Sequence, residues 1–145
     1  MQIDSSSTLK GCRWVAPPVR ADCNGIETWA IARELGFEAP RLFWLTSIAK
    51  GQWRGRHAHR DSILATFAVK GHCQMSLDDG QDTQTVELIE NGPGLIIGAW
   101  VWHELYDFTP SAAILVVAST TYSEADYIRD YDVFLAETAQ RRKTG

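Results

Sequence analysis

Short runs of apolar and alternating residues follow one another from residue 41 to residue 118, with turn residues between them. Many short strands punctuated by Gly, Asn and Asp are typical of an antiparallel sandwich or barrel, and not of alternating strands and helices. The pattern therefore predicts an all-β fold without internal repeats. The expected strands are Arg41–Ile48, Ile63–Lys70, His72–Leu77, Thr83–Ile89, Leu95–Ile97, Val101–Phe108 and Ala112–Ala118.

Individual segments refine this picture. Ile63–Lys70 is almost entirely apolar, as expected of a strand that is buried on both faces. The run Asp78–Gln81 has the composition of a hairpin turn. Trp14–Val19 is apolar but holds two prolines, which favours an edge strand or a loop. Thr28–Leu35 fits either a short helix or an extended segment, and the polar, serine-rich residues 1–12 are expected to be loosely ordered.

Near the end of the chain the spacing of apolar residues changes from that of a strand to that of a helix, which predicts a short helix there. Ser123 is the candidate N-cap, with Asp126 as its partner three residues later. This helix is expected to pack on the barrel or on a partner subunit. One face of the expected helix carries Tyr127, Tyr131, Phe134 and Thr138. Its C-terminus carries the cations Arg141, Arg142 and Lys143, which suit that end of a helix.

Length and charge narrow the class of protein. A chain of 145 residues is expected to form one domain, residues 1–145. A net charge of −4 without a basic face argues against a nucleic-acid partner. No apolar run reaches the roughly 18 residues of a membrane span, and the first residues do not resemble a signal peptide. The odd, irregular set Cys12, Cys23 and Cys73 predicts free thiols in a reducing compartment, the cytoplasm.

The candidate chemistry lies in two short segments that carry three of the four histidines. His57 and His59 are separated by one residue, so a β-strand would present both on one face. His103 shares a face with Val101 and Leu105 in the same way. If these strands are neighbours in a small barrel, the three imidazoles enter one cavity.

Two kinds of site fit three converging histidines. A metal site needs three or four ligands, usually with a carboxylate, and Asp61 is the nearest candidate after His59. Arg54, Arg56 and Arg60 would repel a dication there unless an anionic substrate bridged them. A proton-transfer site needs fewer converging groups than a metal site. An imidazole titrates near pH 6.5, and an arginine can stabilise an oxyanion or a phosphate. The residues favour proton transfer beside a carbonyl, and metal binding remains the alternative.

The chain resembles the cupin-fold nucleotide-sugar 3,4-ketoisomerases of the dTDP-4-keto-6-deoxyglucose type over roughly residues 25–135. That family has the pattern R-G-x-H-A-H-K, and this chain has Arg60 at its lysine. Metal-binding cupins carry a glutamate four or five residues after H-x-H, where this chain has apolar residues. The matching segments are Arg54–His59, Leu77–Gly80, Val101–Glu104, Ser119–Phe134 and, more loosely, 36–44.

The resemblance implies a fold, a reaction and roles for residues. It implies a cupin-type antiparallel β-barrel or jelly roll, a homodimer with exchanged N-terminal strands, no metal or other cofactor, and a dTDP-linked keto sugar of deoxysugar biosynthesis as substrate. The carbonyl moves between C4 and C3 through an enediol(ate). His57 and His59 become the acid–base pair, with His59 as the shuttling base. The implied substrate-binding residues are Arg41, Arg54, Trp102, His103 and Tyr106.

Departures from the family pattern bear on specificity. Phe43 and Trp44 stand where relatives have a tyrosine, so a phenol that can donate a proton is missing there. Trp100 falls where relatives usually have a proline. The configuration at C4 depends on which ring face the base addresses. A metal-dependent cupin such as a dioxygenase and a non-catalytic nucleotide-sugar-binding cupin are the alternative functions.

Overall fold

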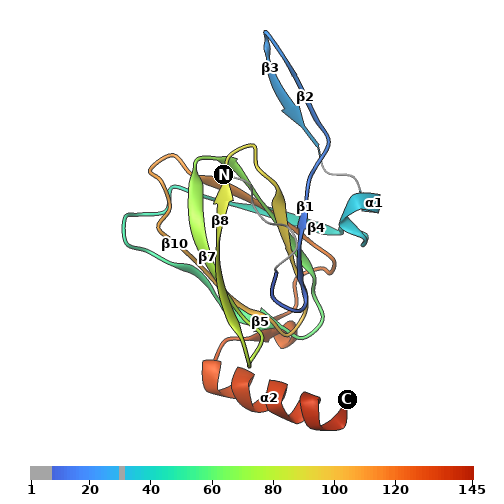
Figure 1. Cartoon of the computed structure of the whole chain (residues 1–145). Coiled ribbons are helices and arrows are strands. Elements are labelled where there is room, and N and C mark those ends of the chain that lie inside the picture. The colour runs from blue at the N-terminus through green and yellow to red at the C-terminus, as the bar shows by residue number, and fades with distance from the viewer. Residues whose placement is uncertain (1–7, 30–31) are drawn as a thin grey trace.

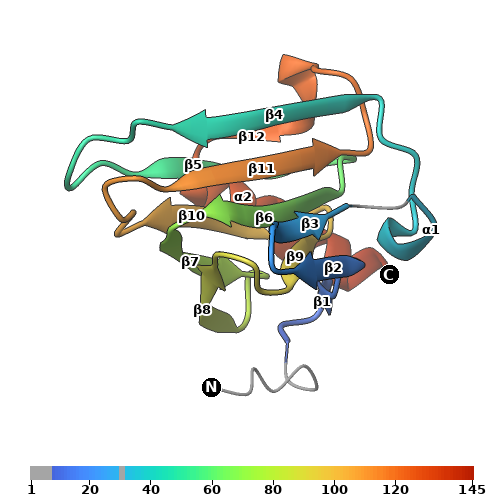
Figure 2. The same ribbon diagram turned by 90° about the horizontal axis from the view of Figure 1, so that it is seen from above.

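The computed structural model describes residues 8–29 and 32–145, and these form a β-barrel of two five-stranded sheets (Figures 1 and 2). Every strand pair is antiparallel. The expected all-β barrel with a C-terminal helix is confirmed. One sheet has the order β1 (Cys12–Val15), β9 (Gly94–Ile97), β6 (Leu64–Lys70), β11 (Ala113–Ala118) and β4 (Arg41–Thr46). The other has β12 (Tyr127–Ile128), β5 (Arg54–His59), β10 (Trp102–Tyr106), β7 (His72–Asp78) and β8 (Thr83–Ile89).

The main core lies between these two sheets, because each strand turns its apolar side chains toward the other sheet. Strand β6 is buried on both faces over five consecutive residues, as its apolar sequence predicts. Its inner residues Leu64 and Ala68 join the main core, while Ala65 and Phe67 pack outside it with α1 (Ala32–Leu35). Among the side chains fully buried in the main core are Cys73, Met75, Leu77, Leu88, Leu95, Ile97 and Ile114.

A two-stranded arm of β2 (Val19–Asp22) and β3 (Gly25–Thr28) projects from the barrel in Figure 1, at the end away from the C-terminal helix. All eight of its strand residues are exposed. The sequence analysis did not anticipate this hairpin. The helix that it considered at Thr28–Leu35 is limited to the single turn of α1.

The C-terminal helix starts later than the sequence predicts. Helix α2 (Tyr131–Thr144) is capped by Asp130, whose carboxylate accepts a hydrogen bond from the Val133 amide at 3.1 Å. Ser123 instead precedes a short 3-10 turn, η1 (Glu124–Asp126), and makes no side-chain cap. Tyr127 belongs to β12, because this segment pairs with β5 before the helix begins.

Helix α2 packs on the barrel, which was one of the two expectations for it. Phe134 is fully buried beneath it with Ala58, Trp102 and Ile128. Near the other terminus, Leu9 and Cys12 are buried in the main core, so the chain is held to the barrel from that point, while residues 1–7 lie outside the described part. None of the helices within residues 8–29 and 32–145 is long and apolar enough to cross a membrane.

Candidate active site

A cavity of about 310 Å³ opens between the two sheets of the barrel. Apolar, aromatic and charged side chains line it together. A concave site of this kind, with a few converging polar groups, is the usual form of a small-molecule site. The lining residues are Phe43, Leu45, Arg54, Gly55, His57, Leu64, Thr66, His103, Leu105, Val116, Tyr127 and Arg129.

A β-bulge in β5 shapes one wall of this cavity. The pairing of β5 with β10 shifts between His103↔His57 and Glu104↔Gly55, which leaves Arg56 as an extra residue. Gly55 and Arg56 both have left-handed backbones, with φ of 82° and 61°. In a regular strand Arg54 and His57 would face opposite sides. The extra residue Arg56 places Arg54 and His57 on the same face of β5, so both side chains line the cavity.

The three histidines converge as the sequence predicted. The ring centroid of His57 lies 4.9 Å from that of His59 and 4.7 Å from that of His103. Burial, together with the nearby His59, lowers the pKa of His57 to about 4, and burial holds the pKa of His103 well below 6.5. At neutral pH these imidazoles are therefore uncharged and able to accept a proton.

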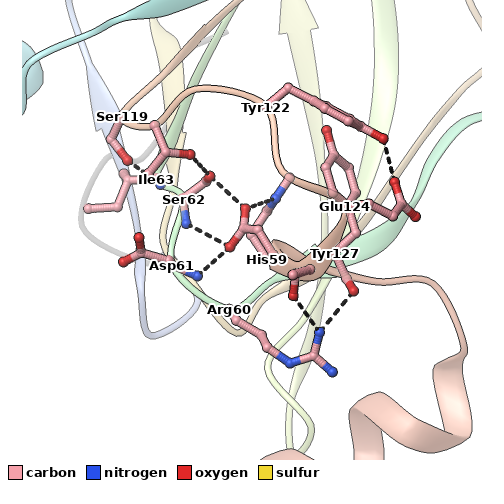
Figure 3. A network of polar contacts seen from close by, with 12 residues as sticks. His59, Arg60, Asp61, Ser62, Ile63, Ser119, Tyr122, Glu124 and Tyr127 are labelled. Atoms are coloured by element: carbon pink, nitrogen blue, oxygen red, sulfur yellow. Dashed lines mark hydrogen bonds and ion pairs between the residues drawn. The ribbon is translucent and has the colours of Figure 1, made fainter.

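His59 is only 3% exposed and is not a lining residue of the cavity, but its ring contacts those of the lining residues His57 and Tyr127. Its Nδ1 is 2.8 Å from Oδ2 of Asp126 (Figure 3). Burial is the main cause that lowers the pKa of His59 below its usual value, with smaller contributions from Arg41 and Arg129, while the Asp126 carboxylate acts in the opposite direction. A carboxylate accepts the Nδ1 proton, and this tautomer leaves the lone pair on Nε2. Sequence reasoning missed this role, because it assigned Asp126 to a helix cap.

Three further hydrogen bonds hold the Asp126 carboxylate. Ser62 donates its hydroxyl to Oδ2 at 2.6 Å and its amide to Oδ1 at 3.3 Å, and the Asp61 amide donates to Oδ1 at 2.6 Å. Burial of Asp126 opposes ionisation, yet these donors and His59 bring its pKa to about 2. Asp126 is therefore a fixed anion behind His59.

Tyr127 and Arg129 are cavity residues that sequence reasoning did not select. The Tyr127 ring lies 4.8 Å from that of His57 and 4.6 Å from that of His59. The Arg129 guanidinium lies 4.3 Å from the Tyr127 ring centroid. Both positions fall within the motif at Ser119–Phe134, which was the available signal. Their place in the cavity follows from the β12–β5 pairing, which that motif does not reveal.

The proposed phosphate or oxyanion contacts, Arg41 and Arg54, lie in different surroundings. Arg54 lines the cavity. Arg41 lies beside it, and its Nη1 donates to the Tyr127 hydroxyl at 3.4 Å. The guanidinium of Arg41 also lies 5.4 Å from the ring centroid of Phe43, and its Nε is buried without a hydrogen-bond partner. Arg41 thus has donor capacity left beside the cavity.

The structure does not place Trp102 and Tyr106 in the cavity, in contrast to the sequence analysis. Side chains alternate along β10, so His103 faces inward and these two face outward. Trp102 packs against Phe134, with ring centroids 5.7 Å apart, and donates its indole N–H to Glu104 at 3.1 Å. Tyr106 stacks on an aromatic ring outside the cavity, Trp53, with centroids 4.4 Å apart. Neither is kept as a proposed substrate contact.

Whether a metal ion fits this site can be judged from the ligand atoms that surround it. His57, His59 and His103 offer nitrogen atoms that lie within 4.8 Å of one another. The carboxylate nearest to them, Asp126, is engaged by His59 and Ser62, and no carboxylate belongs to the group within the described residues. Arg129 lines the same cavity, and its charge disfavours a dication. Three histidines alone can hold a zinc ion, so it is the positive charge beside them that disfavours a metal here.

A cupin-type β-barrel with a histidine cavity flanked by arginines defines the class of this protein. The family model described as "FdtA: WxcM-like, C-terminal" matches residues 12–139, and the chain belongs to this family. It is 35% identical over 102 residues to the TDP-4-oxo-6-deoxy-alpha-D-glucose-3,4-oxoisomerase of Aneurinibacillus thermoaerophilus, covering 70% of this chain and 73% of that protein.

Solved structures show the same likeness. The sugar 3,4-ketoisomerase QdtA from Thermoanaerobacterium thermosaccharolyticum, in complex with TDP, superposes with a TM-score of 0.89 at 30% identity, covering 92% of this chain and 98% of QdtA. A mutant of QdtA was solved with TDP-4-keto-6-deoxyglucose. The WlaRB TDP-quinovose 3,4-ketoisomerase from Campylobacter jejuni has a TM-score of 0.83 at 31% identity, covering 88% and 99% of the two chains.

Proposed function

We propose that this protein is a 3,4-ketoisomerase that interconverts the 4-keto and 3-keto forms of a dTDP-linked 6-deoxyhexose in deoxysugar biosynthesis. The observation that carries the proposal is the contact of His59 with Asp126 behind a cavity lined by His57, in a chain whose relatives are named as 3,4-ketoisomerases. No metal takes part in the proposed chemistry.

The proposed reaction moves two protons. His59 Nε2 takes the proton from C3, and the C3–H electron pair forms a C3=C4 double bond while O4 takes up negative charge. O4 receives a proton and the C3 hydroxyl loses one, for which His57 is the proposed partner. His59 then returns its proton to C4, and the carbonyl remains at C3. Arg54 and Arg129 are the cations that stabilise the enediolate oxygen or bind the diphosphate.

Asp126 is the proposed positioning residue for His59. A base that takes a proton from carbon needs its lone pair on the atom that reaches the substrate. The hydrogen bond at Nδ1 keeps the lone pair on Nε2, the nitrogen that we propose for this role. The negative charge of Asp126 also stabilises the imidazolium that forms during the reaction. Because Ser62 and the Asp61 amide hold the carboxylate, the His59 ring is held in one orientation.

Tyr127 is the proposed source of the phenol that is missing at Phe43 and Trp44. Its hydroxyl accepts a hydrogen bond from Arg41, and its ring lies against both His57 and His59. A phenol in this place can exchange a proton with the substrate oxygens while a nearby cation stabilises the oxyanion.

Solvent deuterium exchange tests the function. The wild-type protein is expected to incorporate deuterium from D₂O into dTDP-4-keto-6-deoxyglucose, and His59→Asn is expected to abolish this while dTDP still binds. His72→Asn is the control, because the His72 side chain is 50% exposed, lies 3.9 Å from Glu87 and is not a lining residue of the histidine cavity. If wild type binds the nucleotide sugar but incorporates no deuterium, the binding-module alternative is correct. Activity that a chelator removes and a divalent metal restores would favour the metal-dependent alternative.

We further propose that the protein is a homodimer in which the β2–β3 arms are exchanged. Opposite residues in an antiparallel hairpin share a face, so Val19 and Thr28 lie on the same face as Ala21 and Ile26. Val19 is 51% and Ile26 55% exposed, so this face is largely apolar and open to solvent. A lone two-stranded hairpin is marginally stable in water. Burial against a second copy would supply the missing contacts.

Light scattering after size-exclusion chromatography tests the dimer. We expect a mass of twice 16.2 kDa, and a double variant Val19→Lys and Ile26→Lys should run as a monomer. Arg20→Gln on the other face of the arm is the control and should remain a dimer. A monomeric wild type, or a dimer that survives the double substitution, would exclude arm exchange as the basis of assembly.

The cytoplasm remains the proposed compartment. Cys12, Cys23 and Cys73 are free thiols, as predicted. Burial raises the pKa of Cys12 and of Cys73 to about 12, so neither forms a reactive thiolate at neutral pH. Fractionation of cells that express the full chain would test this, and a periplasmic or extracellular pool would contradict it.

A further inference from the structure

A second cavity, of about 550 Å³, lies outside the barrel and shares no lining residue with the histidine cavity. The last turns of α2 form one side of it. The turn between β7 and β8, which lies beside this helix in Figure 1, forms another. Lys10, Gly11 and the loop that ends at Val101 complete the wall. Four segments far apart in the sequence therefore meet around one hollow.

Trp100 is the aromatic wall of this second cavity. It has a left-handed backbone with φ of 63°, which is rare for a large side chain. Its amide donates to the carbonyl oxygen of His59 at 2.7 Å, which holds the loop in this conformation. The Arg141 guanidinium lies 4.2 Å from the centroid of its ring. Conformations of this kind persist only where the surrounding structure holds them, and they are concentrated at functional sites.

The charge of the second cavity is positive. Its walls carry the cations Lys10, Arg141 and Arg142, and none of them forms an ion pair within the part of the chain that the structure describes. The single acidic side chain in the wall is Asp79, whose Oδ1 accepts the backbone amides of Gln81 and Asp82, both at 2.8 Å. Gly145, whose terminal carboxylate is a second negative group, also lines the cavity. Three cations against two carboxylates, one of them already hydrogen-bonded, leave an excess of positive charge.

We propose that this second cavity binds a phosphate-bearing anion, with its phosphate groups on Lys10, Arg141 and Arg142. Guanidinium groups present paired N–H donors that match phosphate oxygens, and an ammonium group adds a point charge. The volume accommodates a diphosphate with its substituent, and the indole of Trp100 offers a surface to an aromatic base. The site is separate from the histidine cavity, so the proposal does not depend on the isomerase activity.

A probe that reports on Trp100 itself separates the two cavities, because phosphates can also bind to the arginines beside the histidines. The full chain labelled with 5-fluorotryptophan is titrated with inorganic pyrophosphate at constant ionic strength, and Trp100→Phe assigns the Trp100 fluorine signal. We expect this signal to shift with a saturable dependence on pyrophosphate. Arg142→Gln should weaken the shift about tenfold, as loss of a charge-assisted contact does.

Lys143→Gln is the matched control, since Lys143 carries the same charge on the same turn of α2 but lies outside the cavity wall. It should leave the affinity within about twofold. Equal losses in the two variants would show that only diffuse charge acts, and an unmoved Trp100 signal would show that pyrophosphate does not bind in this cavity. Either result would overturn the proposal. dTDP is the second probe: tighter binding than pyrophosphate at Trp100 supports a nucleotide site, and equal binding supports a site for the phosphate groups alone.

Discussion

Asp126 Oδ2 lies 2.8 Å from His59 Nδ1, although the two residues are 67 positions apart in the sequence. The pair forms because β12 lies along β5, which brings the end of the 3-10 turn against the last residue of the histidine strand. A hydrogen bond to a fixed carboxylate turns an ordinary buried histidine into a base of defined tautomer. The same strand pairing brings Tyr127 into the cavity.

Asp126→Asn should lower kcat by about 10²–10⁴-fold, the range spanned by general acid–base catalysis. The amide can donate to Nδ1, which favours the tautomer with the proton on Nε2, where the lone pair is needed. Asp61→Asn is the matched control: its carboxylate is exposed, and only its backbone amide contacts Asp126. Steady-state kinetics with both variants measure this. A change confined to KM in Asp126→Asn would contradict a role in positioning the base.

Tyr127→Phe removes a single hydroxyl from the cavity. We expect kcat to fall by about 10²-fold or more with little change in dTDP binding, if this phenol exchanges protons with the substrate oxygens. Tyr122→Phe is the control, because Tyr122 is 60% exposed and bonds Glu124 outside the cavity. Unchanged kcat in Tyr127→Phe would leave the proton exchange to His57.

Stability should fall as the pH is lowered from 6.5 toward 4. The folded state holds the pKa of His57 at about 4, against about 6.5 in the unfolded chain, so between these values the unfolded chain binds more protons. His103, whose pKa is also depressed, acts in the same direction. Thermal melts from pH 7 to 4.5 should show a falling Tm, less steep in His57→Gln. A Tm independent of pH over this range would show that the histidines are not buried as neutral groups.

The bulge in β5 makes Gly55 a sensitive position. A Cβ atom there would lie 2.8 Å from the carbonyl oxygen of His103, and the backbone φ is 82°. Gly55→Ala should therefore destabilise the fold by more than the roughly 1–2 kcal/mol of a left-handed alanine alone. Gly51→Ala isolates that backbone cost, because Gly51 has φ of 80° and nothing within 4 Å of its Cβ position. Denaturant unfolding measures both, and equal losses would disprove the steric contribution.

Much of this protein could be read from its sequence, because the information is local. Apolar runs and turn residues predicted seven of the ten barrel strands to within one or two residues, as for β8, whose bounds match the predicted Thr83–Ile89, but they did not predict β1, β5 or β12. The spacing of His57 and His59 depends only on the period of a strand, and His103 joined them once β10 paired with β5. Such patterns act over a few residues and need no knowledge of packing.

The tertiary structure decided which face of a strand each side chain occupies and which distant segments of the chain pair with each other. A single extra residue, Arg56, changes which side chains enter the cavity, and the pattern of apolar residues does not mark it. Trp102 and Tyr106 lie on the outward side of β10 and therefore outside the site. Which side of the strand is outward depends on which face meets the other sheet. Asp126 reaches His59 only through the β12–β5 contact. Periodicity along the chain determines local structure, whereas the neighbours of each side chain are set by the packing of the whole barrel.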